Sequence, residues 1–70
     1  MDRTAVASSN VSSVGYDPAS QTLEIQFHNG SIYQYYNVTE TVYENLMQSP
    51  SKGGYLNTYI KNSHPYSRVG

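Results

Sequence analysis

Hydrophobic and polar residues alternate in two neighbouring runs, TLEIQFH and SIYQYYN, which are joined by Asn29-Gly30. Alternation with a period of two is typical of a half-buried β-strand. Asn-Gly between two such runs favours a two-residue type I′ turn, because both central residues of that turn need positive φ. The pattern therefore predicts an antiparallel hairpin with Asn29 and Gly30 at its tip.

A two-residue turn also fixes which residues lie opposite each other in the hairpin. The expected pairs are His28 with Ser31, Phe27 with Ile32, Ile25 with Gln34 and Leu23 with Tyr36. Opposite side chains share a face of the sheet. The predicted apolar face consists of Leu23, Ile25, Phe27, Ile32 and Tyr36, together with Val14 and Tyr16 of the preceding run. Tyr33 and Tyr35 are then expected on the opposite face, across from Gln26 and Glu24.

Three further segments complete the predicted fold. The run VSSVGYD is joined to the hairpin by DPASQ, whose Asp-Pro start suits a type I turn. In residues 39–49, Thr39 can cap a helix whose apolar stripe is Val42, Tyr43, Leu46 and Met47. Residues 55–62 repeat such a stripe. We therefore expect an α+β fold: a three-stranded antiparallel β-meander followed by two short helices packed on one sheet face, in the order β-β-β-α-α.

The chain has 70 residues, enough for one small domain. Residues 1–10 are small and polar and are expected to form a flexible N-terminus, with the domain in residues 11–70. A chain of this size without cysteines has a small core and no disulfide to support it, which favours a homo-oligomer. No apolar leader or membrane-length segment occurs, so we expect a cytoplasmic protein with no membrane partner.

The formal net charge is −1, and the basic residues are concentrated near the C-terminus. Lys52, Lys61 and Arg68 lie after residue 50, where there is no acidic residue. Proteins that bind long duplex DNA carry a much stronger basic stripe, so we expect no such partner. The local cationic character is compatible with a ligand that carries a few phosphates.

Catalytic constellations are missing from the sequence. There is no cysteine nucleophile, and neither His28 nor His64 has a carboxylate or a second histidine at a metal-site spacing. We therefore expect a non-enzymatic protein without catalytic residues, metal site or cofactor.

Two features are candidates for a binding site. Tyr33 and Tyr35, on the sheet face away from the core, resemble a stacking platform for nucleobases. The alternative is that the chain's own tail or another subunit covers them, since strands accept tyrosine readily. Ser51, Lys52 and Gly53 precede a predicted helix, whose free amides attract anions. The alternative for this segment is a plain turn between two helices. Arg68 could add a bidentate phosphate contact.

The chain also resembles the KTSC domain, a small family named for copies at the C-terminus of some lysyl-tRNA synthetases, with stand-alone copies in bacteria and their phages. The matching residues run in family order over about residues 8–69. They are Val14-Gly15-Tyr16-Asp17, Asn29-Gly30, Tyr33-Gln34-Tyr35, Val42-Tyr43, Leu46-Met47, Ser51-Lys52-Gly53 before Tyr55, and Pro65-Tyr66 ahead of Arg68. The resemblance implies no catalytic residues, and its synthetase context suggests RNA binding. Thr39 and Ser67 depart from the family pattern, where a proline and a further basic residue are common.

The first hypothesis is a non-enzymatic binding module for a nucleotide-bearing ligand, either a small nucleotide signal or a short single-stranded RNA. Tyr33 and Tyr35 would stack on a base, or Tyr16 if the faces are exchanged, while Ser51, Lys52, Gly53 and Arg68 would hold phosphate. A phage protein of this kind would sequester a host nucleotide signal. The second hypothesis is a homo-oligomerising interaction module with Tyr33 and Tyr35 at the interface, because tyrosine is enriched at interface cores.

Overall fold

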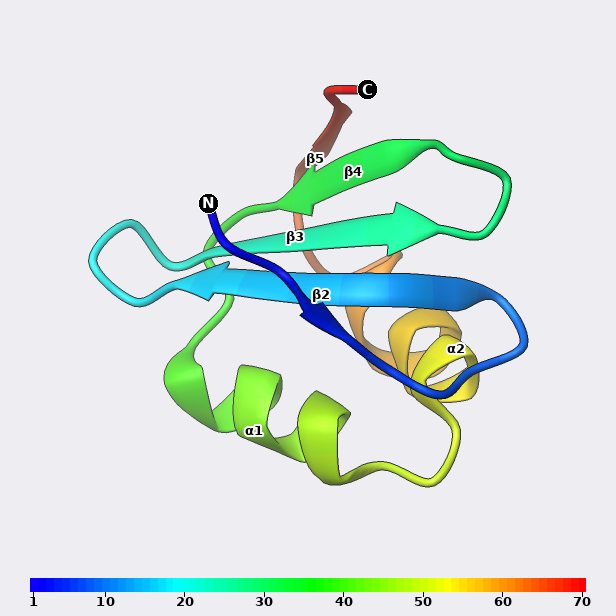
Figure 1. Cartoon of the computed structure of the whole chain (residues 1–70). Coiled ribbons are helices and arrows are strands. Elements are labelled where there is room, and N and C mark those ends of the chain that lie inside the picture. The colour runs from blue at the N-terminus through cyan, green and yellow to red at the C-terminus, as the bar shows by residue number, and fades with distance from the viewer.

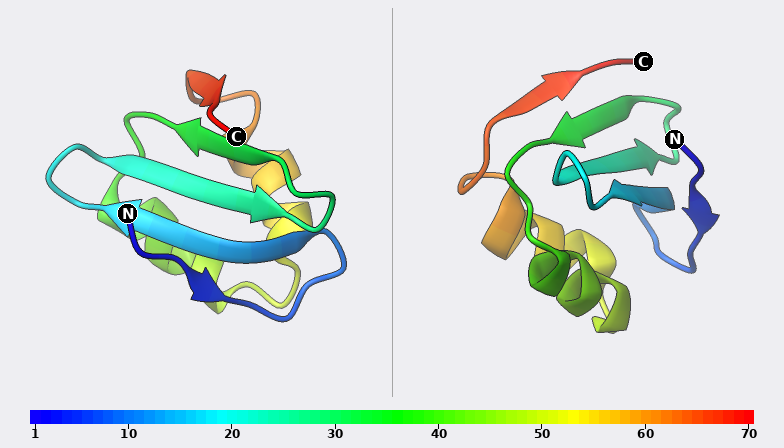
Figure 2. Two further views of the ribbon diagram at one scale, coloured as in Figure 1. Left: turned by 45° about the horizontal axis from the view of Figure 1, so that its top comes forward. Right: turned by 90° about the vertical axis from the view of Figure 1, so that its left-hand side faces the viewer.

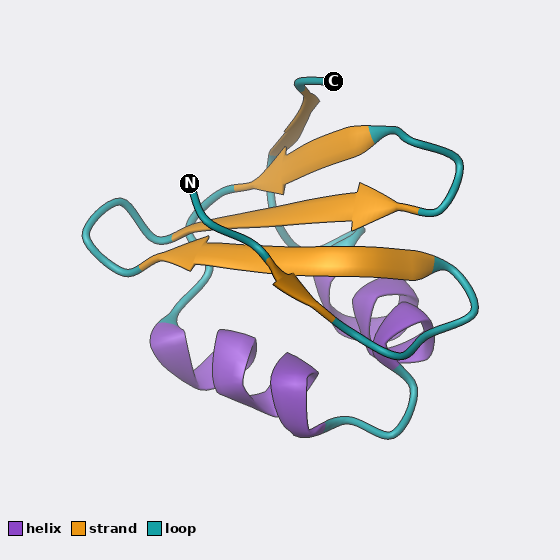
Figure 3. Cartoon of the chain, viewed as in Figure 1, coloured by secondary structure: helices purple, strands orange, loops and turns teal.

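One antiparallel sheet runs through the whole chain, with its strands in sequence order. The computed structural model describes all of residues 1–70 and shows two layers, the sheet and a pair of helical segments on one of its faces (Figures 1 and 3). The five strands are β1 (Thr4–Ala5), β2 (Val11–Asp17), β3 (Thr22–Phe27), β4 (Ile32–Tyr35) and β5 (Tyr66–Arg68).

The α+β class and the central meander β2-β3-β4 are confirmed, but the prediction of only three strands is wrong. β1 lies within the segment 1–10 that we expected to be flexible, and it pairs with β2 through Thr4 and Ala5. β5 lies in the C-terminal tail and pairs with β4. Strands of two or three residues carry no readable alternation, so only their partners in the folded sheet define them.

The predicted register of the hairpin is wrong by one residue. The observed pairs are Leu23 with Tyr35, Glu24 with Gln34, Ile25 with Tyr33 and Gln26 with Ile32. Of the two turn residues only Gly30 has positive φ, at +92°, so the loop cannot be a type I′ turn. The Gly30 N–H donates to Phe27 O and the Phe27 N–H donates to Ser31 O, both at 2.9 Å. The loop therefore has three residues, 28–30.

The side chain of Asn29 supplies the physical reason for this turn. Its Oδ1 accepts a hydrogen bond from the Ser31 N–H at 3.0 Å and another from the Ser31 hydroxyl. Such a bond to the backbone two residues on is the usual turn chemistry of asparagine. It leaves Gly30 as the only residue of this loop with positive φ, as in three-residue hairpin loops that end in a glycine bulge.

A shift of one residue moves every side chain of a strand to the other face. Tyr33 and Tyr35 therefore share a face with Leu23 and Ile25, not with Glu24 and Gln26 as predicted. Ile32 and Tyr36, which we expected in the core, lie on the opposite face. We call the two sides the helix-covered face and the open face; Figure 2 shows both helical segments on one side of a curved sheet.

The helical layer is close to the prediction. α1 (Glu40–Gln48) begins after Thr39, whose side chain accepts a hydrogen bond from the Val42 N–H. α2 (Lys52–Tyr55) begins after Ser51 and continues directly into η1 (Leu56–Ile60), a segment of π-helix in which the Lys61 N–H donates to Leu56 O at 2.9 Å. Both segments pack against the helix-covered face.

Nine buried residues form the core between the two layers. They are Val11, Val14, Leu23, Ile25, Tyr35, Val38, Leu46, Leu56 and Ile60. A bulge between Val11 and Ser13 allows Val11 and Val14 to share a face although they are three positions apart. Tyr16 is half-buried against this core, as predicted.

Candidate functional site

A pocket of about 550 Å³ lies between the helix-covered face of the sheet and the α2–η1 segment. Four aromatic side chains from β3, β4 and β5 form one side of it: Phe27, Tyr33, Tyr35 and Tyr66. The volume falls within the range typical of small-molecule sites. We call these four side chains the aromatic wall.

The rings of the aromatic wall contact one another in a continuous row. Phe27 meets Tyr33 edge to face, with ring centroids 5.8 Å apart. Tyr33 and Tyr35 are nearly parallel at 6.5 Å, and Tyr66 lies 6.1 Å from Tyr33 and 5.9 Å from Tyr35. The pairing of β4 with β5 positions Tyr66 directly opposite Tyr35. Tyr66 remains 59% exposed, so part of the wall is open to a ligand.

Tyr35 is the most deeply placed member of the wall, with 2% of its surface exposed. Its hydroxyl makes no hydrogen bond within the chain, yet no unpartnered side-chain polar atom is sealed from solvent. This hydroxyl therefore opens toward the pocket that Tyr35 lines. Burial raises the pKa of Tyr35 to about 12, so the group stays protonated and can donate a hydrogen bond at neutral pH.

Side-chain amides surround the rest of the pocket. Four of the chain's six asparagines line it: Asn10, Asn29, Asn57 and Asn62. Asn29 is occupied by its bonds to Ser31. The other three amides have no hydrogen-bond partner within the chain, so their donors and acceptors are available to a ligand.

The charges at the pocket are cationic. Lys61 lines it, with Nζ 5.9 Å from the centroid of the Phe27 ring. No aspartate or glutamate lines it. Arg68 lies directly opposite Tyr33 in the sheet and is exposed, with Nε donating to Gly70 O at 2.9 Å. A ligand with negative charge is therefore favoured over a cationic one.

The structure brings together four of the seven residues named from the sequence. Tyr33, Tyr35 and Gly53 line the pocket, and Arg68, which does not line it, pairs with Tyr33 in the sheet. Ser51 and Lys52 do not line it. The Ser51 hydroxyl accepts a hydrogen bond from the Gly54 N–H at 3.2 Å, and Lys52 Nζ donates to Ser49 O at 3.1 Å. These two side chains serve the turn and the helix start.

Tyr16 is separate from the aromatic wall. Its ring stacks on Tyr43 with centroids 4.6 Å apart, and its hydroxyl donates to Val38 O at 2.6 Å. It therefore fastens α1 to the sheet.

Sequence reasoning missed several pocket residues, chiefly Phe27, Asn57, Lys61 and Tyr66. Gly53, Asn57 and Lys61 follow each other at intervals of four, next to the buried Leu56 and Ile60, so helical spacing alone could have grouped them. Tyr66 had no such signal, because its position depends on the pairing of β5.

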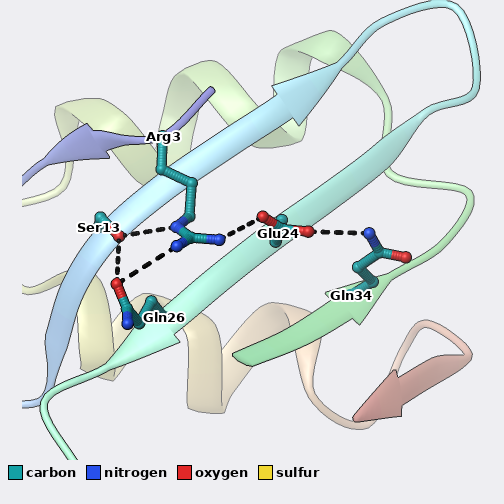
Figure 4. A network of polar contacts seen from close by, with 5 residues as sticks. All are labelled: Arg3, Ser13, Glu24, Gln26 and Gln34. Atoms are coloured by element: carbon teal, nitrogen blue, oxygen red, sulfur yellow. Dashed lines mark hydrogen bonds and ion pairs between the residues drawn. The ribbon is translucent and has the colours of Figure 1, made fainter. Parts of the chain in front are cut away.

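The open face carries a polar network (Figure 4). Arg3 donates to Glu24, to Ser13 Oγ at 3.1 Å and to Gln26 Oε1 at 3.5 Å. Gln34 Nε2 donates to the other Glu24 oxygen at 2.9 Å. The hydrogen bond from Gln34, and then the Arg3 guanidinium, hold the pKa of Glu24 below its usual value although burial acts in the opposite direction.

The N-terminal segment closes over this network. A Cβ atom on Gly15 would lie 2.7 Å from Asp2 O and 3.0 Å from Arg3 Cγ, so glycine is required where the segment crosses β2. None of the helices has both the length and the apolar composition needed to cross a bilayer. Nowhere do three side chains of His, Cys, Asp or Glu gather as a metal site would require.

The fold and pocket define a class of small α+β domain, and comparison with known proteins gives its family. The sequence model of the KTSC domain matches residues 7–66, and the chain belongs to that family. The crystal structure of a KTSC domain protein from Yersinia pestis superposes with a TM-score of 0.92 at 40% identity, covering 99% of this chain and 97% of that one.

Two relatives show the settings in which similar sequences occur. A lysine–tRNA ligase of Nostoc sp. is 44% identical over 54 residues, which are 77% of this chain and 10% of the ligase. The chain thus spans about a tenth of the length of that relative. A protein of Stutzerimonas stutzeri is 39% identical over 64 residues, covering 91% of this chain and 90% of that protein.

Proposed function

We propose that this protein is a non-enzymatic binding module for a nucleotide-bearing ligand, a small nucleotide or the end of a short single-stranded RNA, in the cytoplasm. The observation that carries the proposal is the aromatic wall beside a pocket of about 550 Å³. Stacking of a base on tyrosine or phenylalanine rings contributes about 1–3 kcal/mol per base.

The exposed surface of the aromatic wall is large enough for one stacked base but not for several successive bases of a strand. Tyr35 is buried and Tyr33 is half-buried, so the accessible aromatic surface is provided mainly by Phe27, Tyr33 and the exposed Tyr66. A long single strand needs a succession of exposed rings along an open groove. The wall is therefore matched to a mononucleotide-sized group.

Two cations support a small anionic group on that ligand, one that lines the pocket and one on the strand paired with Tyr33. Lys61 lines the pocket beside Phe27, and Arg68 is exposed opposite Tyr33. A guanidinium can make two parallel bonds to a phosphate, and an ammonium acts as a point charge. We assign phosphate contacts to these two side chains rather than to Ser51 and Lys52, which are engaged by the helix start and its turn.

The relatives add context without identifying the ligand. One of them is a lysine–tRNA ligase, and the matched region is a tenth of its length. The name of that enzyme gives it an RNA substrate. A module that holds a single nucleotide is compatible both with such a setting and with the sequestration of a nucleotide signal by a stand-alone phage protein.

Two equally exposed tyrosines give the test of this proposal. Tyr66 belongs to the aromatic wall and is 59% exposed, whereas Tyr59 is 58% exposed and lies outside the pocket. Tyr66→Ser should weaken binding of a nucleoside monophosphate or a short RNA about 5- to 150-fold, the equivalent of one stacking contact. Tyr59→Ser should leave binding unchanged. Isothermal titration calorimetry on both variants measures the difference, and equal behaviour of the two would refute the proposal.

One observation favours the alternative, a homo-oligomerising module. The outer edge of β5 is unpaired, and Tyr66 and Val69 beside it are 59% and 51% exposed. An exposed edge strand is a natural place for a second chain to add. In this alternative the interface residue is Tyr66, in place of the Tyr33 and Tyr35 that the sequence suggested. Native mass spectrometry of the wild type and of Tyr66→Ser would detect an assembly that the substitution dissociates.

A further inference from the structure

We infer that the pocket reads the base of its ligand through the side-chain amides of Asn10 and Asn57, and that adenine is the base it selects. The inference rests on the proposed function, because it requires that a base enters the pocket.

The two amides line the same pocket although they come from different parts of the chain. Asn57 lies four residues after Gly53, on the same side of the helical segment. A Cβ atom on Gly53 would lie 3.3 Å from Asn10 Nδ2 and 3.6 Å from Asn10 Cβ. The absence of a side chain at Gly53 thus allows Asn10 to lie against the helix, one turn from Asn57, and all three residues line the pocket.

The backbone of Asn10 is fixed while its side chain is unpaired. The Asn10 carbonyl accepts a hydrogen bond from the His28 N–H at 2.9 Å, and its own N–H donates to Ser8 Oγ at 3.3 Å. Neither the Asn10 nor the Asn57 side chain has a partner within the chain. The Tyr35 hydroxyl, on a side chain only 2% exposed, is a third unpartnered group at the same pocket.

The chemistry of an amide decides which base fits. Asparagine offers one acceptor oxygen and an N–H₂ donor, and it pairs in a bidentate manner with the N6 amine and N7 of adenine. Cytosine is usually read by a carboxylate, and none lines this pocket. Guanine is usually read by arginine or lysine, and Lys61 lies beside the ring of Phe27 where we assign it to phosphate.

Adenosine and inosine monophosphates provide a matched pair of probes. They share sugar and phosphate, but inosine monophosphate has an oxygen in place of the N6 amine. Calorimetric titration of the full chain should give an affinity about 5- to 150-fold higher for adenosine monophosphate, the range expected for one bidentate contact. Asn57→Ala and Asn10→Ala should bring this ratio close to one. Asn45→Ala, an exposed asparagine on α1 outside the pocket, should leave it unchanged.

Each outcome is decisive. A preference for adenosine monophosphate that disappears in Asn57→Ala but persists in Asn45→Ala supports the inference. Equal affinity for both nucleotides, a preference for inosine monophosphate, or an adenine preference unaffected by the two pocket substitutions overturns it and leaves the proposed function intact. Binding of neither nucleotide by the folded wild type overturns the inference, and failure of the other nucleoside monophosphates and of a short RNA to bind as well overturns the proposed function.

Discussion

Glu24 is the residue on which the polar network of the open face depends. Only 8% of it is exposed, and its carboxylate is held by Gln34 and Arg3. A buried carboxylate that loses a partner remains desolvated and poorly compensated, so removal of one partner costs more than the bond itself contributes. The network also fastens the N-terminal segment to the sheet, since Arg3 belongs to that segment.

We predict that Arg3→Ala destabilises the protein by about 1–3 kcal/mol at neutral pH, the range expected when a buried acceptor loses a hydrogen-bond partner. Arg68→Ala is a suitable control, because Arg68 is exposed and bonds only to Gly70 O. Urea denaturation followed by circular dichroism measures both variants. An equal effect of the two substitutions would contradict a structural role for Arg3.

The lowered pKa of Glu24 predicts that the protein loses stability at low pH. Its stabilising contribution is present above the carboxyl's unfolded-state pKa of about 4.3 and is lost as the pH falls through the lower pKa of the folded state. The wild type should therefore lose stability in acid below about pH 4.3. Glu24→Gln should reduce this dependence, which thermal denaturation at stepwise lower pH would show.

Tyr35 predicts the opposite pH dependence, a loss of stability as the pH rises. Its folded-state pKa of about 12 exceeds the ordinary value of 10.0, so stability is complete below pH 10 and falls as the pH rises from 10 toward 12. Tyr35→Phe should remove this loss. At neutral pH it should leave the free energy of unfolding nearly unchanged, since the hydroxyl has no partner in the chain. A wild type whose melting temperature is the same as that of Tyr35→Phe throughout this alkaline range would argue against the assigned burial.

At the scale of elements, one loop decides the chemistry of both faces of the sheet. A two-residue turn would have buried Ile32 and Tyr36, whereas the three-residue loop buries Tyr35 and aligns Tyr33 with the pocket. The sequence predicted the hairpin, because the alternation is strong. It could not predict the loop length, because Asn-Gly suits both turn types and the choice depends on the bonds between Asn29 and Ser31.

We predict that Gly30→Ala destabilises the protein by about 1 kcal/mol, since φ is +92° and a Cβ there is strained although no atom lies within 4 Å of it. Gly30→Asn should cost less, because asparagine tolerates positive φ better than alanine. Denaturant midpoints of the two variants make the comparison. If alanine proved no worse than asparagine, backbone strain would not be what fixes this loop.

The helices were more predictable than the edges of the sheet. Thr39 and Ser51 cap the two helical starts. Of the predicted stripes, Leu46, Leu56 and Ile60 are buried, whereas Tyr59 is exposed. Local signals suffice for such elements, since capping and apolar spacing lie within a few residues. β1 and β5 could not be predicted because their strand pairing is set by the tertiary structure. The position of Tyr66 depends on the pairing of β5, so it could not be predicted either.

At the scale of the whole molecule, the chain measures 27 × 25 × 22 Å, and its two faces have different chemistry. The open face carries the Arg3–Glu24 network and the N-terminal segment, while the helix-covered face carries the core and, at its β3–β5 end, the pocket. Sequence reasoning supplied Tyr33, Tyr35, Gly53 and Arg68 as candidates but assigned the two rings to the wrong face. The site as a whole is a product of tertiary structure, since its lining comes from five separate segments.

The most direct test of the central claim is a titration of the isotope-labelled protein with adenosine monophosphate, followed by amide chemical shifts in NMR spectra. The account predicts shifts that saturate and that concentrate at Asn10, Asn57, Lys61 and the aromatic wall, with little change at Arg3, Glu24 and Gln34 on the open face. Shifts centred on the open face, or no saturable shift for this or any other nucleoside monophosphate at millimolar concentration, would contradict it.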